Sequence, residues 1–292
     1  MDSLSQDNPN DVGDAMDKIV HIILNPYYEL ATYVWGDAFF KYYKSILEKR
    51  AQDYDDYVLV HLFKQDAVWS KFVAILNQYK DQFIVDDGVA HGASNLKVGY
   101  NNTLLHACDD ETAQIAGLIG LFKQTSCLVG QQLCPFLSQH GTKWTIGNTQ
   151  PMYLVSGPDD EVKSFLLPEM ESVTWLHDQF HSGAEIKAQD FYSKMLALYD
   201  QEIAKWGDSS VAYYLNINKT YRKLWDSGFI LKKQVQPPPP PQPPQPKKKW
   251  KIVLKMESDL TGYAYIGRFK IPIYIYSLGK NIAGEAEEEE GQ

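Results

Sequence analysis

One proline-rich stretch limits what this chain can fold into more than any other feature. Residues 237–246 read PPPPPQPPQP, and Lys247, Lys248 and Lys249 follow directly. Proline fixes φ near one value and has no backbone N–H, so a run of this kind cannot form a helix or a central strand. We expect an extended polyproline II rod that rises about 3 Å per residue. The rod therefore separates a long first part of the chain from a short last part.

Charge is distributed unevenly on the two sides of the rod. The whole chain has a net charge of −9. Residues 1–236 carry 20 basic and 30 acidic side chains, whereas residues 247–280 carry eight basic and two acidic ones. The last twelve residues include five glutamates and no basic residue. Blocks of opposite sign indicate different partners at the two ends of the chain.

Composition excludes several classes of protein. Hydrophobic residues make up 44% of the chain, which is enough for a folded core. Three cysteines, an odd and sparse set, do not form a disulfide framework. The polar, acidic N-terminus does not match a signal peptide, and no apolar run is long enough to span a membrane. We therefore expect a cytoplasmic protein without a membrane partner, although the PKKK sequence at 246–249 also matches a nuclear-import signal.

Residues before the rod show mainly a helical period. Apolar residues recur at helical spacing in 37–50, 55–83, 189–206 and 211–225, and helices are also predicted to start at Asp109 and near Gly157. The glycine-rich stretch 85–100 contains Asp86-Asp87-Gly88, which is typical of a turn, and predicts a loop. Residues 143–155 predict one or two strands. The first part is therefore predicted to be a mainly helical body.

After the rod, the period changes to two residues. Residues 249–256 and 269–276 alternate apolar with polar, and 263–266 can supply a strand between them. The predicted fold class is thus α+β, with a mainly helical N-terminal body, a polyproline linker and a small antiparallel β segment. The predicted divisions are a disordered N-terminus (1–15), the body (16–235), the linker (236–248), the β segment (249–280) and an acidic tail (281–292). So small a sheet is marginal alone, so we expect it to dock on the body or on a neighbouring subunit.

Two histidines form a candidate metal site. His177 and His181 lie four residues apart, so they share one face if this segment is helical. Two imidazoles at this spacing can bind zinc, but the residue after the first is Asp178 rather than the glutamate of the metalloprotease motif. The alternative is an ordinary pair of surface or half-buried histidines on an amphipathic helix.

A second cluster contains His106, Cys108 and the acids 109–111. A Cys108–histidine pair could act in nucleophilic catalysis. The alternative is that the acids cap a helix while the cysteines, with Cys127 and Cys134 further on, fill a core. The standard phosphate-binding glycine loops and the GxSxG elbow do not occur in the sequence, so no cofactor is predicted.

The β segment combines lysines with aromatic residues. Lysines attract a phosphate backbone and aromatic rings stack on bases, which are the two requirements for binding single-stranded nucleic acid. The candidate residues for binding nucleic acid or a protein partner are Lys247, Lys248, Lys249, Lys251, Lys255, Lys270, Tyr274 and Tyr276. An ordinary amphipathic sheet with edge lysines is the alternative. The rod itself fits either a ligand for a proline-recognition domain or a stiff spacer.

These features predict a non-enzymatic structural or assembly protein. We expect it to form a homo-oligomer, in a capsid-like or nucleocapsid-like role in which the basic-aromatic segment contacts nucleic acid. The alternative function is a metal-dependent hydrolase that uses His177 and His181.

Overall fold

The structure is a computed structural model that describes five stretches of the first part of the chain: 16–25, 45–89, 92–98, 104–153 and 159–234. In the last part it describes three strands within 253–274. The chain divides into two compact units, Met1–Val235 and Gln236–Gln292.

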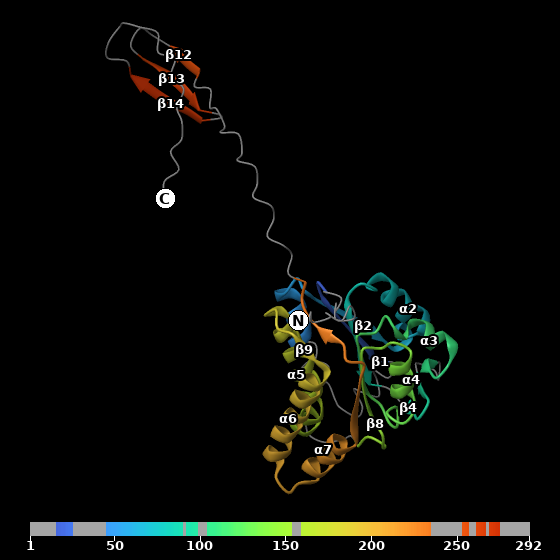
Figure 1. Cartoon of the computed structure of the whole chain (residues 1–292). Helices are drawn as coiled ribbons and strands as arrows, with labels where there is room; N and C mark the ends of the chain where they lie inside the picture. Colours follow the sequence, from blue (N-terminus) through green and yellow to red (C-terminus); the bar gives the residue numbers. More distant parts are fainter. Residues whose placement is uncertain are drawn as a thin grey trace, which may run out of the picture. The chain divides into compact units, whose positions relative to one another are not determined.

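A six-stranded sheet forms the centre of the first unit (Figure 1). Its strands lie in the order β10-β8-β7-β3-β1-β2. The first five strands along the chain are parallel, and β10 joins the edge antiparallel to β8. The strands are β1 (Ile19–Asn25), β2 (Tyr57–Phe63), β3 (Phe83–Val89), β7 (Leu121–Thr125), β8 (Trp144–Asn148) and β10 (Arg222–Asp226). The chain moves from β1 to β2 in one direction and then to β3, β7 and β8 in the other, which is a doubly wound α/β order.

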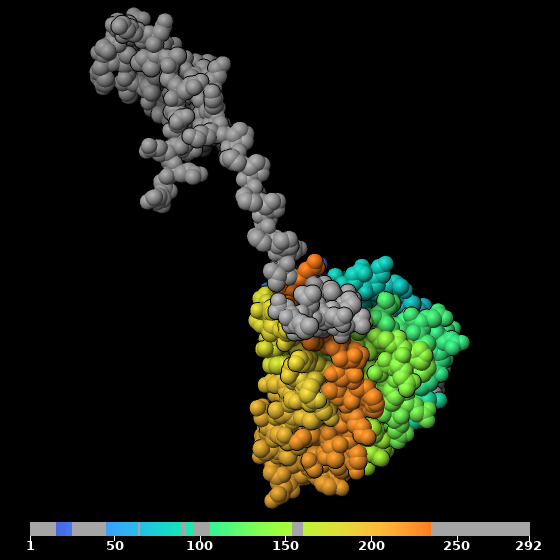
Figure 2. Space-filling view, in the orientation of Figure 1, coloured from blue at the N-terminus to red at the C-terminus, as the bar shows by residue number. Residues whose placement is uncertain are grey.

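Helices cover both faces of this sheet. One face packs against the helical segment 45–53 and against α5 (Asp159–His181), α6 (Ala188–Trp206) and α7 (Ser210–Tyr221). The other face packs against α2 (Trp69–Gln78), α3 (Asp110–Ala116) and α4 (Leu133–Gln139). Figure 2 shows this division, with the yellow and orange atoms of 160–234 on one side of the body and the green atoms on the other.

Short elements complete the first unit. A 3-10 turn, η1 (Lys64–Asp66), precedes α2. A small sheet of β4 (Gly92–Ala93), β5 (Leu96–Val98) and β6 (Leu104–Ala107) lies between β3 and α3 in the chain. A second one pairs β9 (Ile186–Lys187) with β11 (Ile230–Leu231).

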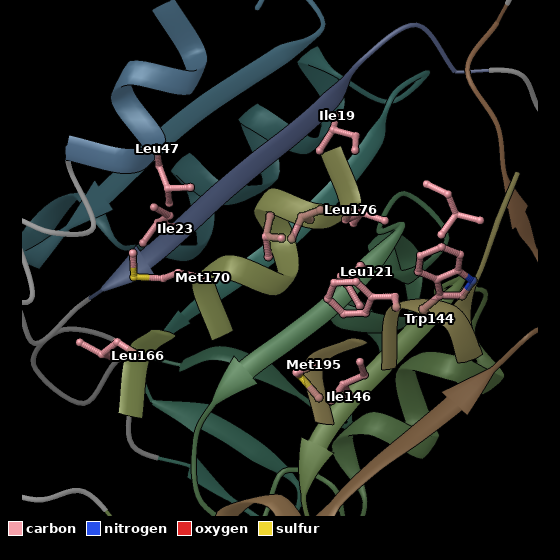
Figure 3. Close-up of a cluster of buried hydrophobic side chains, with 14 of the residues drawn as sticks. Ile19, Ile23, Leu47, Leu121, Trp144, Ile146, Leu166, Met170, Leu176 and Met195 are labelled. Atoms are coloured by element: carbon pink, nitrogen blue, oxygen red, sulfur yellow. The ribbon is translucent and has the colours of Figure 1, made fainter. Parts of the chain in front are cut away.

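Alternation along the strands explains the two cores. Ile19 and Ile23 of β1 belong to the cluster on the α5 face, and Val20, Ile22 and Leu24 belong to the cluster on the α2 face. Figure 3 shows the first cluster, in which Ile23 comes from β1, Met170 from α5 and Trp144 from β8. Every residue of β7 and β8 is buried, as is usual where helices cover both faces of a parallel sheet.

The predicted fold class is wrong. The body is not mainly helical, because a mostly parallel six-stranded sheet forms its core. Residues 57–63 and 121–125 are predicted in helices but form β2 and β7, and the predicted loop at 85–100 begins in β3. The physical reason is that a strand buried on both faces does not alternate, and periodicity cannot separate a short run of this kind from a buried helix.

Helices in the second half of the body follow their local signals. The predicted helix 189–206 is present as α6. The predicted helix 211–225 is helical only to Tyr221, in α7, and its last residues, 222–225, form β10 instead. The hydroxyl of Ser209 accepts the backbone N–H of Ala212, so Ser209 caps α7 as its sequence suggests. The carboxylate of Asp109 likewise accepts the N–H of Thr112 and caps α3.

In the second unit, the structure describes three antiparallel strands in the order β12-β13-β14. They are β12 (Val253–Met256), β13 (Thr261–Ile266) and β14 (Phe269–Tyr274). Their register pairs Lys255 with Tyr263 and Lys270 with Tyr265.

Candidate active site

Both faces of the central sheet change from apolar to charged toward the carboxyl ends of β3 and β7. In β3, the apolar run Phe83–Val85 is followed by Asp86 and Asp87, and in β7 Leu121 and Phe122 are followed by Lys123 and Gln124. All four polar side chains are buried. Ligands of doubly wound sheets bind outside the carboxyl ends of the strands. The polar groups therefore lie toward the edge where a site is expected.

On the α5 face, a buried ionic network crosses the sheet. The ammonium of Lys123 donates to Asp87 at 3.0 Å and to Glu169 of α5 at 3.1 Å. Glu169 also accepts from the hydroxyl of Tyr199 at 2.6 Å and from Arg222 of β10. Burial alone would raise the pKa of Glu169, but the charges of Arg222 and Lys123 hold it below its usual value. The network therefore contains ionised groups that depend on one another.

The same network reaches β1 and β2 through a histidine. His21 Nε2 lies 3.0 Å from Asp87, and its Nδ1 lies 2.6 Å from the hydroxyl of Tyr57. Burial would raise the pKa of Asp87, but the charge of Lys123 and the hydrogen bond with His21 lower it well below its usual range. Four neighbouring strands are thus joined by polar contacts within the core.

On the α2 face, Asp86 is the centre of a smaller network. The amide of Gln124 donates to Asp86 Oδ1 at 2.7 Å, and His106 Nε2 of β6 lies 2.8 Å from Asp86 Oδ2. Aromatic rings of Phe72 and Phe122 pack edge-on against His106. Through these contacts β6 is attached to β3 and β7, which holds the small sheet beside the carboxyl edge.

A cysteine lies on a strained turn at this edge. Cys127 comes two residues after the end of β7 and is half-buried. Leu128, which follows it, has a φ of 61° and is the non-glycine residue in the described part of the chain with a positive φ. Non-glycine residues in this region are strained and cluster at functional sites. A reactive side chain on a sharp turn after a strand is also the arrangement by which nucleophilic elbows expose their nucleophile.

Neighbouring segments hold this turn in place. The backbone N–H of Met152 donates to Cys127 Sγ at 3.3 Å, and the N–H of Gly130 donates to the carbonyl of Asn148 at 2.9 Å. Gly92 packs directly on the turn, since a Cβ built there would lie 2.6 Å from the carbonyl oxygen of Cys127. The segments that follow β7 and β8 and the start of β4 thus meet at this turn.

Two polar side chains beside the turn lack a partner in the described part of the chain. The hydroxyl of Ser126 makes no hydrogen bond there, and neither do the amide nitrogen and oxygen of Asn148. Ser126 is 2% exposed and Asn148 is fully buried. Buried polar groups normally have partners, and an exception calls for an explanation. Groups that recognise a bound ligand are one such explanation.

The other two cysteines are less suited to act as nucleophiles. Burial raises the pKa of Cys134 well above its usual range. Burial, together with the charge of Asp109, raises the pKa of Cys108. Because the thiolate is the nucleophile, both shifts lower reactivity. Cys108, which the sequence suggests as a candidate, therefore loses support relative to Cys127.

The predicted histidine pair lies at the other edge of the sheet, in a group that we call the Asp56 cluster (Asp56, His177, His181, Lys233 and Arg50). Asp56 immediately precedes β2. His177 Nε2 lies 3.0 Å from Asp56 Oδ1, and His181 Nδ1 lies 2.8 Å from Oδ2. Lys233 donates to the same Oδ2 at 2.6 Å. The ligand atoms of Asp56, His177 and His181 lie within 4.8 Å of one another, so the three could hold a metal ion.

The tautomer of His177 does not favour a metal in this cluster. Arg50 Nη1 lies 2.6 Å from His177 Nδ1. A guanidinium can only donate, so Nδ1 accepts and the proton of the neutral ring lies on Nε2, facing Asp56. A metal at Nε2 would move that proton to Nδ1, where a ligating histidine needs an acceptor and finds Arg50 instead. The contacts support an ion-paired cluster.

Most of the predicted nucleic-acid residues lie outside the described residues. These are Lys247, Lys248, Lys249, Lys251 and Tyr276. The other three lie in described strands, Lys255 in β12 and Lys270 and Tyr274 in β14.

Sequence reasoning missed Cys127 as a candidate. It assigned the residues before it to a helix that would end near Cys134, which would place the thiol within a helix. The sequence did contain one signal for Cys127, which is the repetition of an apolar run that ends in polar, chemically reactive residues. An apolar run that ends in polar residues and a cysteine, 121–127, follows a similar run that ends in His91 and Gly92.

A search of known protein families found no family that matches this chain, and no curated protein sequence matches it. Among the described residues, none of the helices has the length and apolar character needed to cross a membrane. Inference of a function therefore depends on the geometry of the site.

Proposed function

We propose that the first unit is a cysteine-dependent hydrolase that cleaves peptide bonds, with Cys127 as the nucleophile. The observation that carries the proposal is the strained turn, which holds a half-buried thiol at the carboxyl edge of a doubly wound sheet. Ser126 and Asn148 support it, because their unpartnered groups offer hydrogen bonds to a substrate.

A cysteine nucleophile needs a general base. His91 lies outside the described residues, but it is bonded to Gly92, which packs on the carbonyl of Cys127. We assign His91 the role of base because it adjoins Gly92 in the sequence.

The proposed reaction follows the general scheme of covalent catalysis. His91 takes the proton of the Cys127 thiol, and the sulfur attacks the substrate carbonyl carbon. The peptide C–N bond breaks, the leaving amine takes the proton from His91, and the acyl group remains on sulfur as a thioester. Water, deprotonated by His91, then attacks the carbonyl carbon of the thioester. The C–S bond breaks, the acid product leaves, and the proton on His91 returns to the sulfur of Cys127.

The test is the reactivity of the three thiols in the full chain. Iodoacetamide alkylation, followed by mass spectrometry, gives a rate for each cysteine across a range of pH. We expect Cys127 to react fastest and His91→Ala to slow it at least tenfold at neutral pH. The matched control is His140→Ala, an exposed histidine bound to the carbonyl of Phe136, which should leave the rate unchanged.

Cleavage is tested separately with a mixed peptide library. We expect new amine termini with the wild-type chain and none with Cys127→Ala. The proposal is wrong if Cys108 reacts as fast as Cys127, or if the Cys127→Ala chain cleaves as well as the wild type.

The second unit carries the prediction of assembly, which we retain as a separate proposal. Its support is the basic composition of 247–280 and the register that pairs Lys255 and Lys270 with tyrosines. Deleting 237–292 should abolish both self-association and binding of single-stranded RNA at low salt. Full retention of both by the truncated chain would refute it.

A further inference from the structure

The large exposed apolar side chains of the described residues gather in one place. They are Tyr153, Tyr213 and Tyr221, and Tyr213 is the most exposed at 63%. Tyr153 stacks on Tyr214, with ring centroids 5.3 Å apart, and Tyr214 meets Tyr213 edge-on at 5.5 Å. We call Tyr153, Tyr213, Tyr214 and Tyr221 the tyrosine surface. Clustered exposed apolar groups mark interaction sites, whereas single ones do not.

The backbone beneath the tyrosine surface is fixed. Asn218 of α7 accepts the N–H of Tyr153 at 3.0 Å and donates to its carbonyl at 2.7 Å. The N–H of Thr149 donates to the carbonyl of Tyr221 at 3.0 Å. The segment after β8 is therefore held against α7, and the rings form a preformed platform. Preformed surfaces bind with a smaller loss of conformational entropy.

We propose that the tyrosine surface binds the proline rod, residues 237–246, of a second copy of this chain. Grooves lined by aromatic residues recognise polyproline II segments, which are already extended and lose little entropy on binding. The rod provides the PxxP spacing of such ligands five times, at 237–240, 238–241, 240–243, 241–244 and 243–246. Tyrosine rings pack on proline rings, while their hydroxyls can donate to the free carbonyls of the rod.

The start of the rod and the tyrosine surface lie at different edges of the sheet, which favours binding of the rod from a second copy over binding of the rod from the same chain. The body leads into the rod at the amino edge of the sheet, where the N–H of Gln234 donates to the carbonyl of Met16, three residues before β1. The tyrosine surface lies at the carboxyl edge, since Tyr221 directly precedes Arg222, which pairs with the last residue of β8. Figure 1 shows α7 at the opposite end of the body from β9, the partner of β11.

The length of residues 237–246 also favours a second copy. A five-residue strand spans about 17 Å, and a rod of ten residues spans about 31 Å. Within one chain, more than half of the rod would be used to reach the surface, which leaves about four residues and only one of the five PxxP spacings. A neighbouring copy can place the whole rod on the rings.

The experiment compares the self-association of full-length chains by sedimentation velocity over a range of concentrations. One variant carries Tyr213→Ala, and a second replaces 237–246 by a Gly/Ser sequence of equal length, which abolishes the polyproline II rod. Each should weaken self-association at least tenfold. The control is Gln201→Ala, an exposed change on α6, which should have no effect. Far-UV circular dichroism verifies that each variant is folded.

Mixing separates a contact between copies from a contact within one chain. The Tyr213→Ala chain keeps its rod and the Gly/Ser chain keeps its rings, so an equimolar mixture should associate more strongly than either variant alone. If the mixture does not, or if Tyr213→Ala associates like the wild type, the proposal is overturned. The inference does not depend on the proposed catalysis, because Tyr213→Ala should leave the alkylation rate of Cys127 unchanged.

Discussion

The buried carboxylate of Glu169 should be essential for the stability of the body. Glu169 is 4% exposed and accepts hydrogen bonds from Lys123, Tyr199 and Arg222. Glu169→Gln keeps the shape of the side chain but removes its charge. Lys123 then keeps Asp87 as an anionic partner, whereas Arg222 loses its own. Breaking a buried ion pair in this way typically costs about 3–5 kcal/mol.

This cost is a large share of the stability of an ordinary domain, about 5–15 kcal/mol. With a urea m-value of about 3 kcal/mol per molar, at the upper end for small proteins, the unfolding midpoint should fall by about 1–1.7 M. The assay is urea unfolding of the full chain, followed by tryptophan fluorescence and by circular dichroism. Agreement between the two signals tests whether the transition is two-state.

A matched control is available at the surface. Glu185 pairs with Lys232 at 2.8 Å, and both side chains are more than half exposed. Glu185→Gln should leave the midpoint almost unchanged, because exposed pairs contribute little. If Glu169→Gln lowers the midpoint no more than Glu185→Gln does, the assignment of Glu169 as an ionised partner of Arg222 is refuted.

Three further predictions concern the two edges of the sheet. Burial and the nearby Arg50 lower the pKa of His177 below 6.5, so at mildly acidic pH the unfolded chain binds more protons than the folded one. The free energy of unfolding should therefore fall as the pH drops through the unfolded-state pKa of histidine. His177→Gln should flatten this pH dependence, measured as the urea unfolding midpoint at each pH. Gly92→Ala would place a Cβ against the Cys127 carbonyl and should slow alkylation of the Cys127 thiol. Gly117→Ala is the control, because the nearest atom to a Cβ built there is 3.9 Å away, and it should leave the rate unchanged. Equal alkylation rates in the two variants would contradict the role of Gly92. The Asp56 cluster should bind no stoichiometric zinc in a calorimetric titration at neutral pH, and one zinc per chain, lost in His177→Ala, would restore the prediction of a metal-dependent hydrolase.

Local signals predicted the parts of the fold that local contacts determine. The start of α7 follows from its Ser209 cap, and the extent of α6 follows from its apolar stripe. Both helices have one face toward the core and one toward solvent, so their period is visible in the sequence. The strands of the parallel sheet have no solvent face, and their period is therefore hidden.

Asp86-Asp87-Gly88 shows how tertiary contacts override a turn signal. The three residues lie within β3, and both acids are buried. The partners that make this burial possible, Lys123 and Gln124, come 36 and 38 residues later in the chain. Gly88 is required because a Cβ would lie 2.0 Å from the carbonyl oxygen of Leu24 in β1. Acidic residues followed by glycine suit a tight turn, and they also suit a strand whose backbone lies this close to its neighbour. Only the tertiary contacts of the sheet decide between these two structures.

The candidate site was hidden for a related reason. A parallel sheet places the carboxyl ends of β3 and β7 side by side although a crossover connection separates them in the chain. Cys127 and Gly92 are 35 positions apart in the sequence and in contact in the fold. A mainly helical body gives no reason to bring these two segments together. Recognition of a catalytic pair in such a chain thus depends first on identifying its buried strands, because their ends determine which distant residues can act on one substrate.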